Sequence, residues 1–399
     1  MELGNKWIRG AIPSLLIHCS IGTVYCWSLL KNDIAHLMGT DASSIELAFS
    51  LAIFFLGMSA AFGGRYVEKN VVYSSVISMA CFSAGLMASV YAIMIKSIPL
   101  LFLSYGCLMG IGLGIGYISP IKTLMLWFYR NKGLATGIAI SGFGLSKAIY
   151  SPFIVWCNDA YGVLMTISCM SLFSILCMGV ASMIIRKPKD WTEDNNNITV
   201  KGIISVLSNK AYMKIWAIFY INITCGLAVI SFEKDLAELS GIVCIGVLSA
   251  ITAIFNTIGR FGYSTISDLV DNKAKIYMAI FATSSIALLL PISFGINVFL
   301  TAIALCIVNA GYGGGFSTLP TLLENKFGMT NISTIHGLTL SAWALAGLSG
   351  NQLSNIILNY FRGTFSELLF VLMLLYMVAL VIAYTIDSRK IETTQNRKK

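Results

Sequence analysis

Charged side chains are scarce in this sequence, where Asp, Glu, Lys and Arg together make up 11% of 399 residues. Soluble domains carry about 25% charged residues because their surface faces water. Hydrophobic residues reach 57% here, and the mean hydropathy is +0.79. Since a chain with so little charge cannot cover itself in water, its outer solvent must be a lipid bilayer. This composition excludes an ordinary soluble protein.

Patterns that carry metal, disulfide or enzyme chemistry are also missing. The ten cysteines occur without a CxxC pair or a His-rich cluster, so we expect them to pack between helices. GIGLGIGY (110–117) has the composition of a phosphate loop, but it lies inside an apolar stretch instead of following a strand. No nucleophile–base pair is present. We therefore expect a protein that is not an enzyme and uses no cofactor or metal.

Apolar stretches long enough to cross a hydrocarbon core of about 30 Å recur along the whole chain. One long polar segment, 186–210, interrupts them halfway. The prediction is an all-α polytopic membrane protein with an N-terminal six-helix bundle (1–185), a cytoplasmic linker (186–210) and a C-terminal six-helix bundle with a short basic tail (211–399). The twelve expected spans lie near 7–30, 44–63, 71–95, 98–128, 133–156, 161–185, 211–232, 240–266, 274–296, 298–322, 333–358 and 364–387.

The net charge of +9 is a topology signal, because it is spread over short loops and forms no basic groove that would bind nucleic acid. With both termini inside, the cytoplasmic segments hold 20 of the 27 Lys and Arg residues. The outer loops then hold four: Lys31, Lys96, Lys234 and Arg362. This bias predicts a multi-pass protein of the cell (plasma or inner) membrane with both termini in the cytoplasm. We expect a monomer.

Acidic residues are absent from the middle of every expected span. All 18 lie in loops, termini or span ends, and the nearest to the interior are Glu46, Asp268 and Glu324. Basic residues do occur within spans, although burying one costs roughly 2.5–3.5 kcal/mol on insertion scales. Because a bound anion would supply the missing counter-charge, the sequence predicts an anionic substrate.

Arg260 is the strongest candidate ligand for that anion. Ser249, Thr252, Asn256 and Arg260 recur at helical spacing and give span 8 one polar stripe. A guanidinium matches a carboxylate bidentately, and Asn256 stands one turn away. In the alternative interpretation, Arg260 is structural and bonds the helix end near Asp268, about 12 Å along the helix.

Two lysines within spans are less clear. Lys147 lies about 21 Å beyond the start of span 5, too deep for easy snorkelling, so it faces either a cavity or an outer structural contact. Lys122 is eight residues from Arg130, and its stem could snorkel to the cytoplasm.

Polar aromatic side chains accompany these cations at one face of several spans. His18 and Tyr25 share a face of span 1, and Tyr117, Tyr312 and Trp343 lie in spans 4, 10 and 11. Each alone is more often packing than ligand. Together with a central arginine they could surround a small carboxylate.

His18 is the embedded side chain whose charge could change near neutral pH. Burial without an acidic partner favours a neutral ring. We therefore expect that His18 is not the obligatory proton carrier. Transport would then proceed by anion exchange, or with a proton shared in the complex of the anion with Arg260.

The two halves carry similar cytoplasmic turns, GGRYVEKN (63–70) and STISDLVDNK (264–273). They resemble, in degraded form, the signature Gly-x-x-x-Asp-Arg-x-Gly-Arg of the major facilitator superfamily. Gly64, Glu68 and Lys69 fit the first copy, and Asp268 fits the second. The resemblance implies the major facilitator fold, in which two six-helix bundles rock around a midplane site and these turns act in the conformational gate.

Four further segments resemble the oxalate/formate antiporter family within the monocarboxylate-transporter group: GTVYCWSLL (22–30), WFYRNKGLATG (127–137), NTIGRFGYSTISD (256–268) and LPTLLENKFG (319–328). The resemblance implies that Arg260 binds the substrate carboxylate beside Asn256, and that Tyr117 and Tyr25 are cavity tyrosines. Tyr312 falls where oxalate carriers have tryptophan.

One departure concerns the charge of the substrate. Oxalate exchangers have a lysine in span 11, at the position that Trp343 occupies here. We therefore expect secondary transport of a monocarboxylate such as lactate, pyruvate or formate, by proton coupling or anion exchange. Two alternatives stay open: a dicarboxylate or inorganic anion exchanger using Arg260 with Lys147, and a non-transporting receptor or sensor.

Overall fold

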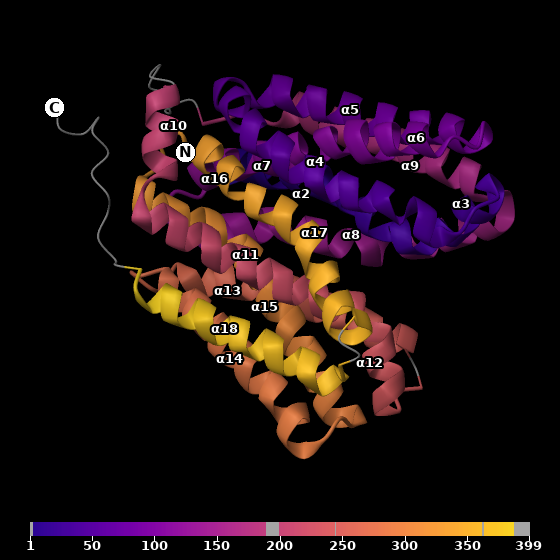
Figure 1. The fold of residues 1–399 in the computed structure, drawn as a ribbon. Helices are drawn as coiled ribbons and strands as arrows, with labels where there is room; N and C mark the ends of the chain where they lie inside the picture. Colours follow the sequence, from indigo (N-terminus) through magenta and orange to yellow (C-terminus); the bar gives the residue numbers. More distant parts are fainter. Residues whose placement is uncertain (1–2, 189–198, 244, 361–362, 387–399) are drawn as a thin grey trace. The chain divides into compact units, whose positions relative to one another are not determined.

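The computed structural model describes residues 3–188, 199–243, 245–360 and 363–386, and every regular element in these ranges is helical (Figure 1). Short 3₁₀ and π-helical segments (η) interrupt some of the helices. Through the first six spans the elements are α1 Leu3–Lys6, η1 Trp7–Ala11, α2 Ile12–Ile21, η2 Gly22–Cys26, α3 Trp27–Met38, α4 Ala42–Lys69, α5 Val71–Met94, α6 Ile98–Leu101, η3 Phe102–Met109, α7 Gly110–Trp127, α8 Lys132–Tyr161 and α9 Val163–Ile184.

The second series begins inside the predicted linker, of which residues 189–198 lie outside the described residues. Its elements are α10 Val200–Leu207, α11 Lys210–Ser231, α12 Glu233–Ser240, α13 Ile245–Ser267, α14 Ala274–Phe294, α15 Val298–Phe327, α16 Ile332–Thr339, α17 Ser341–Asn355, η4 Ile356–Tyr360 and α18 Phe365–Tyr384.

Ten helices of the described chain are long and apolar enough to cross a membrane. The remaining two predicted spans correspond to α13 and to α16 with α17. α13 is one continuous helix, and a turn at Leu340 separates α16 from α17.

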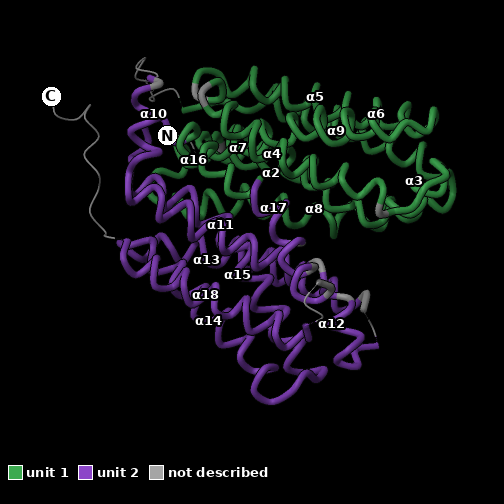
Figure 2. Tube along the Cα trace, viewed as in Figure 1, with its two compact units in different colours: residues 1–197, 333–344 green, residues 198–332, 345–399 purple. Residues whose placement is uncertain are grey.

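The chain forms two compact units (Figure 2). Unit 1 comprises residues 1–197 and 333–344, and unit 2 comprises residues 198–332 and 345–399. Segment 333–344, which the sequence assigned to the C-terminal half, therefore belongs to unit 1. Glycines explain this placement. A β-carbon added at Gly337 would lie 2.1 Å from the Ala60 carbonyl oxygen, and one at Gly57 would lie 2.6 Å from the Leu340 carbonyl oxygen.

The same helix pairings occur in both units. In unit 1, α4 packs on α7, and α5 packs on both α7 and α9. In unit 2, α13 packs on α15, and α14 packs on both α15 and α18. Spans 2, 3, 4 and 6 thus repeat their contacts in spans 8, 9, 10 and 12. This internal repeat matches the similarity between the two cytoplasmic turns in the sequence.

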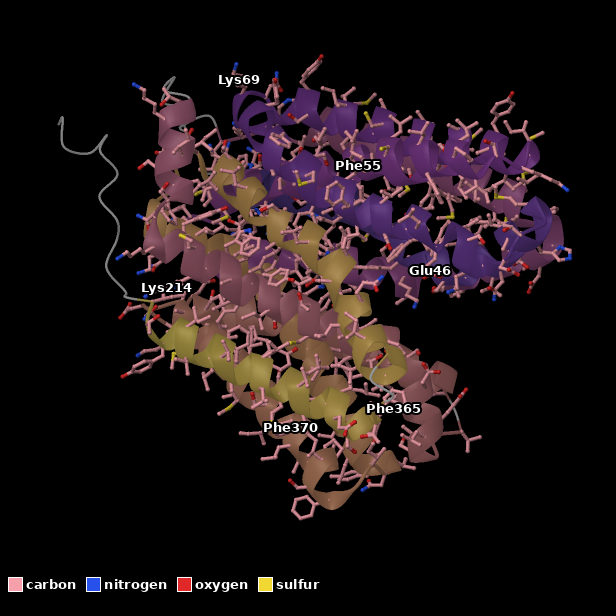
Figure 3. The ribbon with its side chains drawn as sticks, in the orientation of Figure 1. Glu46, Phe55, Lys69, Lys214, Phe365 and Phe370 are labelled. Atoms are coloured by element: carbon pink, nitrogen blue, oxygen red, sulfur yellow. The ribbon has the colours of Figure 1, made fainter. Side chains whose placement is uncertain are left out.

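The first predicted gate turn is wrong in one respect: α4 continues to Lys69, so residues 63–69 are helical and not part of a loop. Figure 3 shows Glu46 near one end of α4, Lys69 at the other and Phe55 between them. Gly64 lies inside the helix, where an added β-carbon would be 2.5 Å from the Ser333 carbonyl oxygen. The glycine pattern read as a turn is therefore a close helix contact.

The second turn follows the prediction more closely. α13 ends at Ser267, and Asp268 begins a short connection to α14. The Lys273 ammonium closes this connection by donating to the Val270 carbonyl oxygen at 2.8 Å and to the Ser267 carbonyl oxygen.

Candidate functional site

Arg260 is buried in unit 2, with 1% of its surface exposed. Its Nε donates to the Asn256 Oδ1 at 2.8 Å, one turn earlier on α13. The guanidinium carbon lies 5.2 Å from the centre of the Phe316 ring on α15. An arginine over an aromatic face gains electrostatic stabilisation that partly offsets its desolvation. The fold thus holds this cation in one orientation, with an amide on one edge and a ring beneath it.

Glycines bring α15 close enough for that contact. A β-carbon at Gly259 would lie 2.0 Å from the Ala310 carbonyl oxygen, and one at Gly313 would lie 2.2 Å from the Asn256 carbonyl oxygen. Neither position has room for a side chain, so α13 and α15 touch through their backbones. The Gly-rich run 311–315 therefore places Phe316 beside Arg260.

Tyr312 is part of an aromatic group on the same helix. Its ring centre is 5.2 Å from that of Phe316, which in turn lies 5.2 Å from Phe219 of α11. Both pairs are edge-to-face, a geometry that adds about 0.5–1.5 kcal/mol beyond area burial. Tyr312 also covers Gly226, where an added β-carbon would be 2.2 Å from its ring. These contacts fix the position of Phe316.

The outer part of the predicted polar stripe has a structural role. Thr252 Oγ1 donates to Glu233 Oε1 at 2.8 Å, and Ser249 Oγ donates to the same oxygen at 3.3 Å. Glu233 begins α12, so these bonds join α12 to α13. Of the predicted stripe, Ser249 and Thr252 therefore hold two helices together, and nothing in the sequence indicated their acceptor because it lies outside α13.

Tyr117 is the centre of an aromatic and histidine cluster in unit 1. The residue is fully buried on α7. Its ring centre lies 5.4 Å from both His18 and Trp343, 5.6 Å from Phe143 and 6.2 Å from His336. Four helices, α2, α8, α16 and α17, thus meet α7 at one tyrosine. We call these five residues the Tyr117 cluster.

The cluster joins predicted residues that are far apart in the sequence. His18 and Trp343 were both expected near the substrate, and the structure places each against Tyr117. Tyr25 contacts the cluster through Phe143: the two ring centres are 5.2 Å apart and the rings meet edge to face. Gly22 allows this approach, because a β-carbon there would lie 2.5 Å from the Phe143 carbonyl oxygen.

His336 and Phe143 are members of the cluster that sequence reasoning did not select. His336 is buried, and its Nε2 makes no hydrogen bond within the described residues. The position of His336 depends on the packing of α16 against α4, which no local sequence pattern predicts. A histidine in an apolar span was the available signal, and it was used only for His18.

The two lysines lie at different depths. Lys122 of α7 is buried, with 5% of its surface exposed, so its side chain does not snorkel into solvent as the sequence suggested. Lys147 of α8 is half-buried and close to Cys26 of span 1. Lys147 is therefore near the first span, but not among the residues of the Tyr117 cluster.

The predicted site residues thus fall into two groups. Unit 1 holds His18, Tyr25, Tyr117, Lys147 and Trp343, whereas unit 2 holds Asn256, Arg260 and Tyr312. Among the described residues, no group of three or more His, Cys, Asp or Glu side chains could hold a metal ion. The chemistry available is that of a buried guanidinium in one unit and of imidazoles among aromatic rings in the other.

Helices of this length and apolarity define a multi-pass membrane protein. Residues 14–351 match the Major Facilitator Superfamily, and the chain belongs to that superfamily of transporters. It is a membrane transporter and not an enzyme, and the predicted twelve-helix fold is confirmed.

Relatives in sequence include carriers of organic acids. The chain is 25% identical to the oxalate:formate antiporter of Oxalobacter formigenes over 374 residues, which covers 90% of this chain and 86% of that protein. It is 22% identical to the uncharacterized transporter YhjX of Escherichia coli, with 86% of each chain covered. Monocarboxylate transporter 13 of Rattus norvegicus is 25% identical over 65% of this chain and 61% of its own.

Solved structures show the same fold. The transporter FucP in its outward conformation matches with a TM-score of 0.69 at 13% identity, covering 94% of this chain and 98% of its own. A bacterial homologue of the iron transporter ferroportin, in an outward-facing state, matches with a TM-score of 0.74 at 11% identity, covering 98% of this chain and all of its own. At such identities the likeness concerns the fold alone.

Proposed function

We propose that this protein is a secondary transporter of small monocarboxylates such as lactate, pyruvate or formate, working by alternating access. The observation that carries the proposal is the buried Arg260, oriented by Asn256 and Phe316. Asn256 occupies the Nε edge of the guanidinium. We assign the Nη edge to the substrate carboxylate, because two parallel N–H groups match its two oxygens.

Charge and shape both favour an organic acid anion. In a low-dielectric interior a buried cation and an anion attract far more strongly than in water. The relatives include proteins named as an oxalate:formate antiporter and as monocarboxylate transporters, which supports the same substrate class. The two-bundle division, the cytoplasmic location of both termini and the cell membrane remain predictions from the spans and from the Lys and Arg distribution.

Trp343 supports one carboxylate per substrate. It is fully buried against Tyr117, at the position where the resemblance places a lysine in oxalate exchangers. An indole cannot neutralise a second carboxylate. The alternative, a dicarboxylate exchanger, would need Lys147 as the second cation. A non-transporting receptor is the alternative from another class.

Counterflow in proteoliposomes tests substrate and transport together. Purified protein is reconstituted with unlabelled lactate, pyruvate, formate or oxalate inside, and uptake of the same labelled anion is followed. We expect uptake of at least one monocarboxylate. Unlabelled oxalate added outside should inhibit that uptake at least about tenfold more weakly than the unlabelled monocarboxylate does, because burying its second charge would cost about 1.4 kcal/mol or more.

Two results would contradict this proposal. No flux of any of the four anions would favour a receptor. Tight oxalate binding that disappears in Lys147→Ala would show that the substrate carries two charges.

A further inference from the structure

Both ring nitrogens of His18 face backbone carbonyl oxygens. Nδ1 lies 3.1 Å from the Ser14 oxygen on the same helix, and Nε2 lies 3.1 Å from the Tyr117 oxygen on α7. The residue is fully buried. Carbonyl oxygens accept hydrogen bonds and never donate them, so each of these two neighbours is an acceptor.

Two acceptors suit the charged form of the ring. A neutral imidazole has one N–H donor and one acceptor nitrogen, whereas an imidazolium has two donors. The neutral ring can satisfy one carbonyl and turns a lone pair toward the other. A buried polar group left without its hydrogen bond costs about 1–3 kcal/mol. The imidazolium makes both bonds, and bonds from a charged donor are the stronger kind.

Titratable groups surround the ring on the helices that pack around it, but carboxylates are few. The only Asp or Glu in α2, α7, α8, α9 and α16 is Asp159, near the end of α8. The other titratable or charged residues in or near the contact region are Cys19 of α2, Tyr117 and Lys122 of α7, Lys147 and Tyr150 of α8, Cys177 of α9 and His336 of α16. The two carbonyl oxygens therefore take the place that a carboxylate has in other proton sites.

We propose that His18 binds the proton that this transporter carries together with its carboxylate. The inference rests on the proposed function and reverses the expectation from the sequence, which considered acidic partners and could not include backbone acceptors. The neutral ring gains one proton at whichever nitrogen lacks it, and releases it on the other side of the membrane. Because the transported form carries both, binding of either raises the affinity for the other, and proton and anion bind cooperatively.

His336 limits the cluster to one proton. Its ring centre lies 6.2 Å from that of the same tyrosine, and it is close enough to His18 for the two to interact electrostatically. Two imidazolium rings at this separation would repel each other. Since Nε2 of His336 has no hydrogen-bond partner among the described residues, the charge belongs on His18.

Proton entry with lactate provides the test. Proteoliposomes containing trapped pyranine, at equal pH on both sides, receive an external pulse of lactate, and acidification in protein-free vesicles is subtracted. Wild type should acidify the lumen. His18→Gln should still exchange lactate at saturating concentration, with a raised KM that no longer changes with pH, because its neutral side chain cannot take up the proton. The variant should lose at least nine-tenths of the acidification.

Two other histidines supply matched controls. His336→Gln removes a buried ring of the same cluster, and His36→Gln removes an exposed one at the end of α3. His36→Gln should acidify the lumen like wild type. His336→Gln alters the cluster, but the lactate that it still takes up should enter with a proton. Acidification that survives in His18→Gln, or that is lost in His336→Gln alone, would overturn the assignment.

The wild type offers a second test if His18→Gln inserts poorly. Its KM for lactate counterflow should rise by up to about tenfold per pH unit above neutrality, since loss of one bound proton per anion weakens binding by that factor. A KM independent of pH from 5.5 to 8.0, or lactate transport without proton entry, would overturn this inference alone. Failure of the wild type to transport lactate, pyruvate or formate would overturn the proposed function as well.

Discussion

Arg260→Ala is expected to abolish carboxylate transport, with a loss of at least about 100-fold in the rate of counterflow while the protein still reaches the membrane. Truncating one partner of a buried, hydrogen-bonded charge pair costs about 2–5 kcal/mol. Here the loss of the Arg260 guanidinium would leave the substrate anion without its cation. Asn256 cannot replace it, because an amide carries no charge. Labelled lactate counterflow, normalised to the amount of reconstituted protein, measures the loss.

Arg260→Lys separates charge from geometry. Lysine keeps the positive charge but loses the planar fork and the Nε–Asn256 bond, so transport should fall severely without disappearing. Arg9→Ala is the control, because that arginine is exposed on the first span. Flux near the wild-type level in a well-inserted Arg260→Ala variant would contradict the binding role.

Gly259→Ala is expected to destabilise the protein more than any other single methyl group added to α13. The new β-carbon would lie 2.0 Å from the Ala310 carbonyl oxygen, which belongs to the backbone of α15 and cannot move aside like a flexible side chain. Overpacking of this kind costs about 1–3 kcal/mol. The apparent melting temperature should therefore fall by about 2–10 °C, and transport should fall with it because Arg260 is the next residue.

Gly262→Ala supplies the matched comparison. It lies three residues later on the same helix, and an added β-carbon would meet nothing within 4 Å. Alanine is the better helix former by about 1 kcal/mol, so this variant should be as stable as wild type or more stable. Equal melting temperatures for the two variants would show that α13 and α15 do not touch at Gly259.

Arg260 and Asn256 show what helical periodicity could predict. Their spacing of four residues placed them one turn apart on one face, and the hydrogen bond between them follows from that spacing alone. The spans could also be predicted from the sequence, because a hydrocarbon core requires long apolar stretches. Both predictions depend on local sequence, which a single chain displays directly.

Contacts between distant helices could not be predicted in this way. The acceptor of Thr252 is Glu233, which the sequence placed in an outer loop. Gly64 read as a turn residue, although it provides space for the backbone of segment 333–334. Backbone carbonyls, which carry no sequence signal, decide the surroundings of His18. Each of these features depends on packing that brings separate spans together.

The central claim is that the protein selects a small anion by its carboxylate. The most direct measurement compares the melting temperature of the purified protein with lactate and with lactamide, its uncharged amide of nearly equal shape. Ligand at 100 times its dissociation constant stabilises the folded state by about 2.7 kcal/mol. Saturating lactate should therefore raise the melting temperature by several degrees in wild type and not in Arg260→Ala, whereas lactamide should raise neither. Equal stabilisation by lactate and lactamide, or an undiminished lactate shift in Arg260→Ala, would contradict the account.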